Sequence, residues 1–148
     1  MKRSERIRQL KNLLDQDAER EAIKLAKMQT QLNDEKNKIL QLRDFKEDYL
    51  HQSLNIGVQV RPEKLQDFEK FIRQLDFSIS QQNKYIVLLI QHVEAQKEIW
   101  LKLNNKVKAY EKWIEKICNE ERVIEGRNEQ KILDAFVTNQ RYTNRDKI

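Results

Sequence analysis

The feature that most constrains the fold is a heptad repeat that runs from Leu65 to Ile124. Of the 18 a and d positions in this window, 15 carry apolar residues, and the exceptions are Gln82, Gln96 and Glu121. Apolar residues spaced alternately three and four apart line one side of an α-helix. The helix that carries so long a stripe cannot bury it, so the stripe requires a second helix to cover it.

The composition is typical of long helices and not of a globular domain. Charged residues make up 36% of the 148 residues, with only two Gly and one Pro, and turn-forming residues are scarce in helical rods. The one clear break combines Gly57, which permits positive φ, with Pro62, which suits the first turn of a new helix. We predict a first helix over about residues 5–53, a loop over about 54–62, a second helix over about 62–136 and a polar, disordered tail over 138–148.

Two amphipathic helices joined by one short loop pair as an antiparallel hairpin. The predicted fold is all-α: a single domain over residues 1–148, built as a long two-helix antiparallel coiled-coil hairpin whose second helix is longer than the first. The heptads restrict the register to facing residue numbers that sum to about 111 or about 118. We favour 118, because it sets small Ala18 opposite bulky Trp100. By either register, residues beyond about 115 have no partner in the first helix.

The heptad of the first helix contains a predicted irregularity. Leu14, Ala18 and Ala22 follow one another in steps of four, which breaks the alternation and locally unwinds a coiled coil. In the second helix, Gln82 and Gln96 weaken the seam. A buried polar pair can fix the register of a coiled coil, but we favour the simpler interpretation that the seam tolerates two half-exposed glutamines.

Apolar residues also lie off the seam. Phe71, Tyr85, Ile99 and Trp113 occupy g positions of the second helix, and Phe77 occupies an f position that should face water. Exposed aromatic residues are frequent in protein contacts. Alternatively, g side chains only cover the edge of the seam. For Phe71 and Tyr85 we weigh both interpretations equally, and for Trp113 we favour an interface.

Residues that carry chemistry are too scattered for catalysis. His51 and His92 lie on different helices and Cys118 is far from both in the sequence, so no set of metal ligands converges. No glycine-rich phosphate loop is present. We expect no enzyme activity, no catalytic residues, no cofactor and no metal. Cys118 is expected to act as a small apolar residue beside the seam.

The charge and the termini restrict the partners and the compartment. The net charge is +5, from 29 basic and 24 acidic residues. Because the two signs are interspersed, no basic stripe is available for phosphates, and we expect no nucleic-acid binding. A single cysteine excludes an internal disulfide and suits a reducing cytoplasm. No signal peptide and no apolar stretch long enough to span a membrane is apparent.

Short patterns follow one another along nearly the whole chain. Each is weak alone, because helical rods share composition, but their order around one hairpin is specific. They are Leu10-x-x-Leu13-Leu14 with Ala22-x-x-Leu25-Ala26-x-x-Gln29-x-x-Leu32, Gln41-Leu42-x-x-Phe45-x-x-x-Tyr49, Phe68-x-x-Phe71-Ile72-x-x-Leu75-Asp76-x-x-Ile79-x-Gln81-Gln82, Trp100-Leu101 with Lys106-x-Lys108-Ala109-x-Glu111, and Arg127-x-Glu129-Gln130-Lys131-x-x-Asp134. In these patterns the chain resembles the FliJ family, the small soluble components of the bacterial flagellar type III export apparatus.

The resemblance implies a coiled coil similar to the central stalk of rotary ATPases. It implies a general chaperone and a coupler between the export ATPase ring and the membrane export gate. The implied partners are the export ATPase and its regulator, the integral-membrane export gate protein and substrate-specific export chaperones. We expect a monomer in the cytoplasm, peripherally associated with the inner face of the cell membrane at the flagellar base.

Two alternatives remain open at this point. One is the corresponding stalk protein of virulence type III secretion, which shares the architecture. The Gln81-Gln82 and Glu129-Gln130-Lys131 segments favour the flagellar branch. The other is a purely structural scaffold that dimerises through the part of the second helix that overhangs the first.

The resemblance also implies binding residues. Family contacts with the export gate match positions near the loop; most keep an apolar or aromatic type, whereas Ser78 and Gln82 depart from it. Leu75 also lies in the seam, so its truncation could act through folding. The seven gate positions are Leu42, Phe45, Tyr49, Phe71, Leu75, Ser78 and Gln82. We assign contact with the ATPase ring to Ile117, Ile124, Glu129, Gln130 and Lys131.

Overall fold

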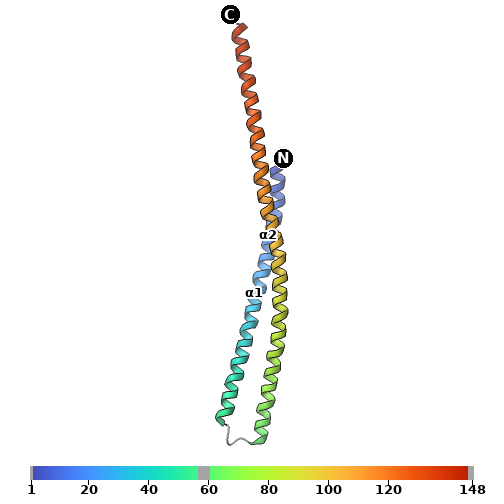
Figure 1. The fold of residues 1–148 in the computed structure, drawn as a ribbon, viewed down its shortest axis with the longest axis vertical. Helices are drawn as coiled ribbons and strands as arrows, with labels where there is room; N and C mark the ends of the chain where they lie inside the picture. The colour runs from blue at the N-terminus through green and yellow to red at the C-terminus, as the bar shows by residue number, and fades with distance from the viewer. Residues whose placement is uncertain (1, 57–60, 147–148) are drawn as a thin grey trace. The chain divides into compact units, whose positions relative to one another are not determined.

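The computed structural model describes residues 2–56 and 61–146, and helices account for nearly all of this part of the chain (Figure 1). Helix α1 spans Arg3–Ile56 and helix α2 spans Pro62–Asp146, with 54 and 85 residues. Pro62 is the first residue of α2, where its fixed φ and missing N–H do no harm. The expected positive φ of Gly57 lies outside the described residues.

The second helix ends later than the sequence predicts. α2 continues to Asp146, so the prediction of a disordered tail over residues 138–148 is wrong for all of it that the structure describes. The hydroxyls of Thr138 and Thr143 donate to the backbone carbonyl four residues earlier, at 2.8 and 2.9 Å. Such bonds satisfy a threonine inside a helix. Polarity by itself therefore did not indicate a helix end.

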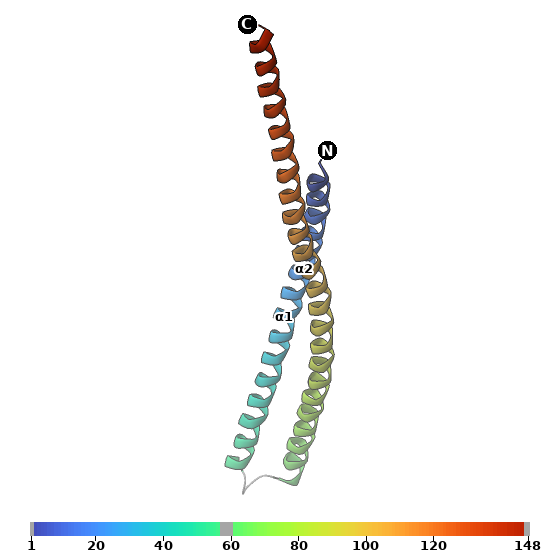
Figure 2. The ribbon, with the colours of Figure 1, turned by 45° about the horizontal axis from the view of Figure 1, so that its top comes forward.

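The chain forms two compact units, and each contains a segment of both helices. Glu19–Leu101 makes one unit, which we call the loop unit; Met1–Ala18 with Lys102–Ile148 makes the other, the terminal unit. In the loop unit, the end of α1 contacts the start of α2 and the helices run in opposite directions (Figure 2). The predicted all-α, antiparallel coiled-coil fold with a longer second helix is thus confirmed.

The core of the loop unit follows the predicted seam. Leu75, Ile86, Leu89 and Val93 of α2 are each at most 8% exposed, and Ile39 of α1 is 6% exposed. Hydrogen-bonded pairs across this seam have residue numbers that sum to 117, since Glu21 meets Gln96 and Glu35 meets Gln82. The register near 118 is therefore correct for this unit, and the register near 111 is excluded.

The core of the terminal unit is formed by Ile7, Ile114 and Ile117, with Tyr110 and Cys118 packed against it. The expectation that residues beyond about 115 lack a partner in α1 is therefore wrong. Ile7 with Ile117 and Ser4 with Glu121 give residue-number sums of 124 and 125, about one heptad above the predicted 118. This offset sets apolar Ile7 against Ile117.

Burial also continues evenly along α1. Ala18 is buried, and Glu21, Ala22 and Leu25, which follow it by three, four and seven residues, are half-buried. Glu21 thus keeps the heptad spacing at the point where Ala22 suggested an irregularity. The apolar pattern missed it because a carboxylate occupies the position.

Gly126 lies inside α2, where an added Cβ would meet nothing within 4 Å. Replacing Gly126 with Ala is expected to stabilise the local helix by about 1 kcal/mol, through backbone entropy alone. Amide hydrogen exchange over residues 122–130 should slow about fivefold. An unchanged or faster exchange would show that intrinsic helix propensity does not determine the stability of this part of α2. Ala109→Gly, at another exposed position of α2, should have the opposite effect around residue 109.

Candidate partner-binding site

A cluster of aromatic rings lies in the loop unit, close to the end of α1. The ring centroid of Phe71 is 6.1 Å from that of Phe45 and 4.5 Å from that of Tyr49. Tyr49 also lies 4.7 Å from Phe68. These are favourable separations for aromatic pairs, which prefer edge-to-face or offset arrangements. Phe45 is 52% exposed, whereas Tyr49 and Phe71 are half-buried. One ring is therefore presented to solvent and the others support it.

The remaining gate positions differ in accessibility. Leu75 is 8% exposed in the seam, as its heptad position predicts, and Leu42 is half-buried. Gln82 is half-buried and bonded to Glu35, whereas Ser78 is exposed. The structure thus offers Phe45 and Ser78 to a partner. A truncation of Leu75 would act mainly on the pairing of the helices.

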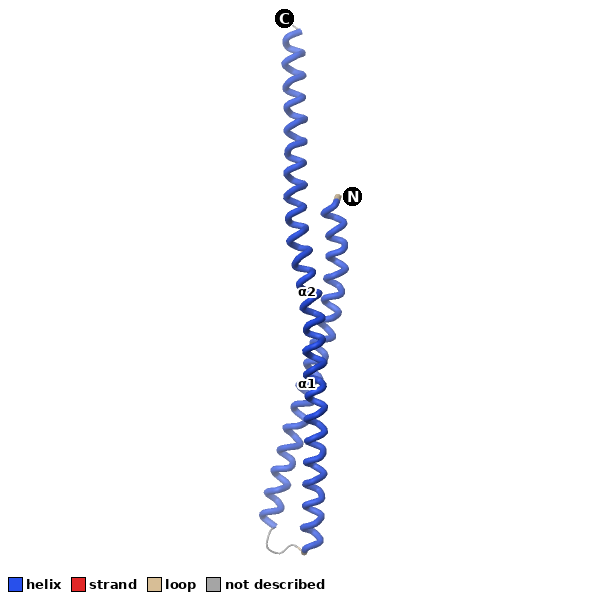
Figure 3. The backbone as a smooth tube through the Cα atoms, turned by 45° about the vertical axis from the view of Figure 1, so that its right-hand side comes forward, coloured by secondary structure: helices blue, strands red, loops and turns tan. Residues whose placement is uncertain are grey.

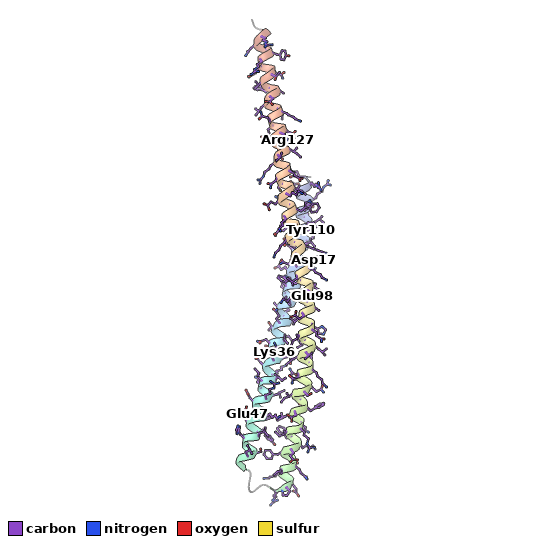
Figure 4. All side chains as sticks on the ribbon, in the orientation of Figure 1. Asp17, Lys36, Glu47, Glu98, Tyr110 and Arg127 are labelled. Atoms are coloured by element: carbon purple, nitrogen blue, oxygen red, sulfur yellow. The ribbon has the colours of Figure 1, made fainter. Side chains whose placement is uncertain are left out.

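The positions assigned to the ATPase ring do not form one accessible group. Ile117 is 3% exposed and lies in the core of the terminal unit, so a partner cannot reach it while the helices stay paired. Ile124 is 55% exposed. Glu129, Gln130 and Lys131 are also exposed. They belong to a stretch of α2, from residue 122 to residue 145, in which every residue is exposed. This stretch includes Arg127, which is labelled among the side chains of Figure 4.

Four of the five off-seam apolar residues are exposed, including Phe77 as its f position predicts, whereas Phe71 is half-buried. Phe77 is 65% exposed, Ile99 is 47% exposed, and Tyr85 and Trp113 are each 41% exposed. Trp113 is partly engaged within its own unit, because the Arg3 guanidinium carbon lies 5.9 Å from its ring centroid. The ring centroids of Trp113 and Tyr110 are also 5.7 Å apart.

The seam contains polar layers that the sequence analysis did not find. The amide nitrogen of Gln82 donates to the carboxylate of Glu35 and, at 3.1 Å, to its backbone oxygen. Gln96 donates in the same way to Glu21, with 3.2 Å to the backbone oxygen. Both glutamines are half-buried, as expected, but each is hydrogen-bonded across the seam, which simple tolerance did not predict. The two glutamates are 14 residues apart on α1, and the two glutamines are 14 residues apart on α2. This matched spacing could have indicated the layers from the sequence.

Each of these glutamates also pairs with a lysine one turn later in α1. Lys24 Nζ lies 3.5 Å from Glu21, and Lys38 Nζ lies 3.0 Å from Glu35. The hydrogen bond from Gln96 lowers the pKa of Glu21, with Lys24 contributing. The hydrogen bonds from Gln82 and then Lys38 lower the pKa of Glu35. Both carboxylates are therefore stabilised in their charged form.

A third polar layer lies at the start of α1. Ser4 is 4% exposed; its hydroxyl donates to Glu121 at 2.8 Å, and its backbone N–H donates to the same carboxylate at 3.3 Å. Ser4 lies in the first turn of α1, whose N–H groups have no partner within the helix. Glu121 of α2 thus caps α1, and the bond from Ser4 lowers the pKa of Glu121. Two contacts flank this layer: Lys2 with Glu125 at 2.7 Å and Arg8 with the Cys118 sulfur at 3.3 Å.

A family model described as the flagellar FliJ protein matches residues 2–147. The chain belongs to the FliJ family. The resemblance seen in the short sequence patterns is thereby confirmed, and the chain is a component of the flagellar export apparatus. Members of this family are non-catalytic components of that apparatus. Comparisons with curated proteins and with solved structures found no match.

The long helices of this FliJ family member raise the question of membrane insertion. Both run without a break through the described residues, as the tube of Figure 3 shows. Among residues 2–56 and 61–146, neither helix has a segment apolar and long enough to cross a membrane.

The lowered pKa values give the polar layers a defined pH dependence. Each folded-state pKa lies below its unfolded value, so the carboxylates stabilise the fold above the unfolded pKa. This contribution is lost as the pH falls through the folded pKa, which lies below the ordinary glutamate value. Replacing Glu21, Glu35 and Glu121 with Gln should flatten the fall in melting temperature between about pH 5 and pH 2. Replacing the exposed Glu19, Glu47 and Glu120 with Gln is the control, which should keep the wild-type profile.

The glutamine–glutamate layers should also show direct energetic coupling. In a double-mutant cycle on urea unfolding, Glu35→Ala and Gln82→Ala should show favourable coupling: the double variant should lose less stability than the sum of the two single losses, because each single substitution already breaks the shared hydrogen bond. The matched control combines Glu21→Ala with Gln82→Ala, two residues of different layers, and should show no coupling. Equal coupling in both cycles would mean that the layers act through general stability and not through the pairing seen here.

Proposed function

We propose that this chain acts as a general chaperone and as a central-stalk-like coupler between the export ATPase ring and the membrane export gate. The observation that carries the proposal is the continuously exposed helix over residues 122–145. A single helix can enter or contact a ring in a way that a paired helix cannot. Ile124 and Lys131 lie on this helix, and we retain them among the ring-binding positions. Ile117 supports it by holding α2 against α1.

The second working surface is the aromatic cluster of the loop unit, which we propose as the contact with the gate. Phe45 is the exposed ring, and Tyr49 and Phe71 fix its position by ring contacts. Rigid aromatic residues that rest on packed neighbours lose little entropy on binding, and they often dominate interface energies. Ser78 is the other accessible member of the predicted gate positions.

The chain itself performs no chemistry in this proposal. It works in the cytoplasm as a monomer, at the inner face of the membrane by virtue of its partners. These are the export ATPase and its regulator, the integral-membrane gate protein and the substrate-specific export chaperones. Membership of the flagellar family favours this system over its counterpart in virulence secretion.

Phe45→Ala tests the proposal against a matched control. Leu40, on the same helix, is 54% exposed, close to the 52% of Phe45, but it belongs to no predicted site. In a strain that lacks the gene, wild type and Leu40→Ala should restore motility and export of filament protein, whereas Phe45→Ala should not. Loss of one central aromatic contact should weaken binding of the purified cytoplasmic part of the gate protein about tenfold or more. Both variants should melt as the wild type does.

Two results would contradict this function. Full motility of the strain that lacks the gene would show that the chain does not serve flagellar export. Equal gate binding by Phe45→Ala and Leu40→Ala would remove the aromatic cluster from the proposal, while the role of the exposed helix would stand.

A further inference from the structure

Helix α2 carries a second line of uncharged residues in the loop unit, distinct from the seam. Its members are spaced alternately four and three apart, so they share one side of the helix. All of them are exposed. We call this line the second stripe; it consists of Gln81, Tyr85, Leu88, His92, Ala95 and Ile99.

The second stripe has the apolar area of a contact surface. Tyr85 is 41%, Leu88 54% and Ile99 47% exposed, and no Asp, Glu, Lys or Arg interrupts them on this line. Large apolar side chains exposed in one continuous line mark binding surfaces, whereas singly scattered ones do not. The spacing is that of coiled-coil knobs, so the shape that fits it is another helix.

A hydrogen bond places the stripe at the edge where the two helices of the loop unit meet. The side-chain amide of Gln31 in α1 donates to the hydroxyl of Tyr85, at 3.1 Å. This bond holds the Tyr85 hydroxyl beside α1, while the residue stays 41% exposed. A helix that lies on the stripe would therefore also come near the side of α1 that carries Gln31.

That side of α1 is basic. Lys24 and Lys38 lie seven residues before and after Gln31, so the three share one position of the heptad. Their side chains are 65% and 62% exposed, although each is also close to a seam glutamate. On α2, Lys84 and Glu98 adjoin the stripe, and Glu98 is labelled in Figure 4. The carboxylates that pair with Lys24 and Lys38 lie in the seam, with side chains only 22% and 13% exposed, so the lysines are the exposed members of these pairs. Exposed positive charge beside the stripe favours a partner with acidic residues next to its apolar face.

We propose that the second stripe binds an amphipathic helix of another protein, with an apolar heptad face flanked by acidic residues. This surface uses neither the aromatic cluster nor the exposed end of α2, so it is a third contact beyond the proposed function. A second copy of the chain is disfavoured as the occupant. In a symmetric dimer the same patch faces itself, which would bring Lys24 and Lys38 toward their counterparts.

The chain offers an unusually close control on the same turn of helix. Val87 and Leu88 are adjacent, and both are 54% exposed, but Val87 lies off the stripe. Likewise Leu101 is 40% exposed off the stripe, compared with 47% for Ile99 on it. The double variant Leu88→Ser with Ile99→Ser can therefore be compared with Val87→Ser with Leu101→Ser. Each removes two exposed aliphatic side chains from α2.

The probe is a fluorescent synthetic helix of about four heptads, with Leu at a and d and Glu at e and g, used where it is monomeric alone. Anisotropy with the full-length chain should show binding in the micromolar range. Leu88→Ser with Ile99→Ser should weaken it at least tenfold, and the off-stripe double variant less than twofold. Ala95→Glu, which inserts a negative charge without truncation, should weaken it as well. A probe with Lys in place of Glu should bind at least tenfold less tightly.

The competing outcomes each overturn the proposal. No binding, equal weakening by both double variants, or equal affinity for the Lys probe would remove the acidic helix as the ligand. A dimer of the chain alone in sedimentation equilibrium, abolished by the Leu88 and Ile99 substitutions, would assign the stripe to a second copy. Circular dichroism must show equal helicity for the two double variants, because both change exposed side chains only.

Discussion

The pairing of α1 with α2 through one seam is the interaction on which everything else depends. Helices of 54 and 85 residues draw most of their stability from a buried face and little from propensity. The apolar residues of the seam supply that burial, but a regular heptad would accept any shift by seven residues. The glutamine–glutamate layers remove this ambiguity in the loop unit, because each amide reaches both the carboxylate and the backbone of one particular partner.

The general fold could be predicted from periodicity, because the heptad positions and one break define two long helices. The polar layers could not be predicted from apolar residues alone. A half-buried glutamate in the seam is seen in the apolar pattern only as a missing apolar residue. Glu21 illustrates this: the apolar pattern passed over it to Ala22, and Glu21 is in fact a paired member of the seam. The later end of α2 was missed for a related reason, because polar residues with helical propensity resemble a tail.

For the candidate site, the sequence predicted the kinds of residues involved better than it predicted which of them are accessible. The sequence patterns identified the family and the aromatic positions, and the structure brings Phe45, Tyr49 and Phe71 into contact. Whether a residue is accessible to a partner depends on which residues of α1 and α2 face each other in each unit. A heptad pattern alone allows several such registers, which differ by multiples of seven residues. Ile117 shows the consequence. It was expected on an unpaired helix, and the shifted pairing of the terminal unit buries it against Ile7 instead.

The cap that Glu121 provides for Ser4 has a consequence for biosynthesis. The hydrogen bond joins residues separated by 117 positions in the chain, so the first turn of α1 leaves the ribosome long before its capping carboxylate exists. A contact of such long range forms late, since the intervening chain must be made and ordered first. The N-terminal turn of α1 therefore lacks its cap during synthesis. It can gain this cap only after α2 has been made as far as Glu121.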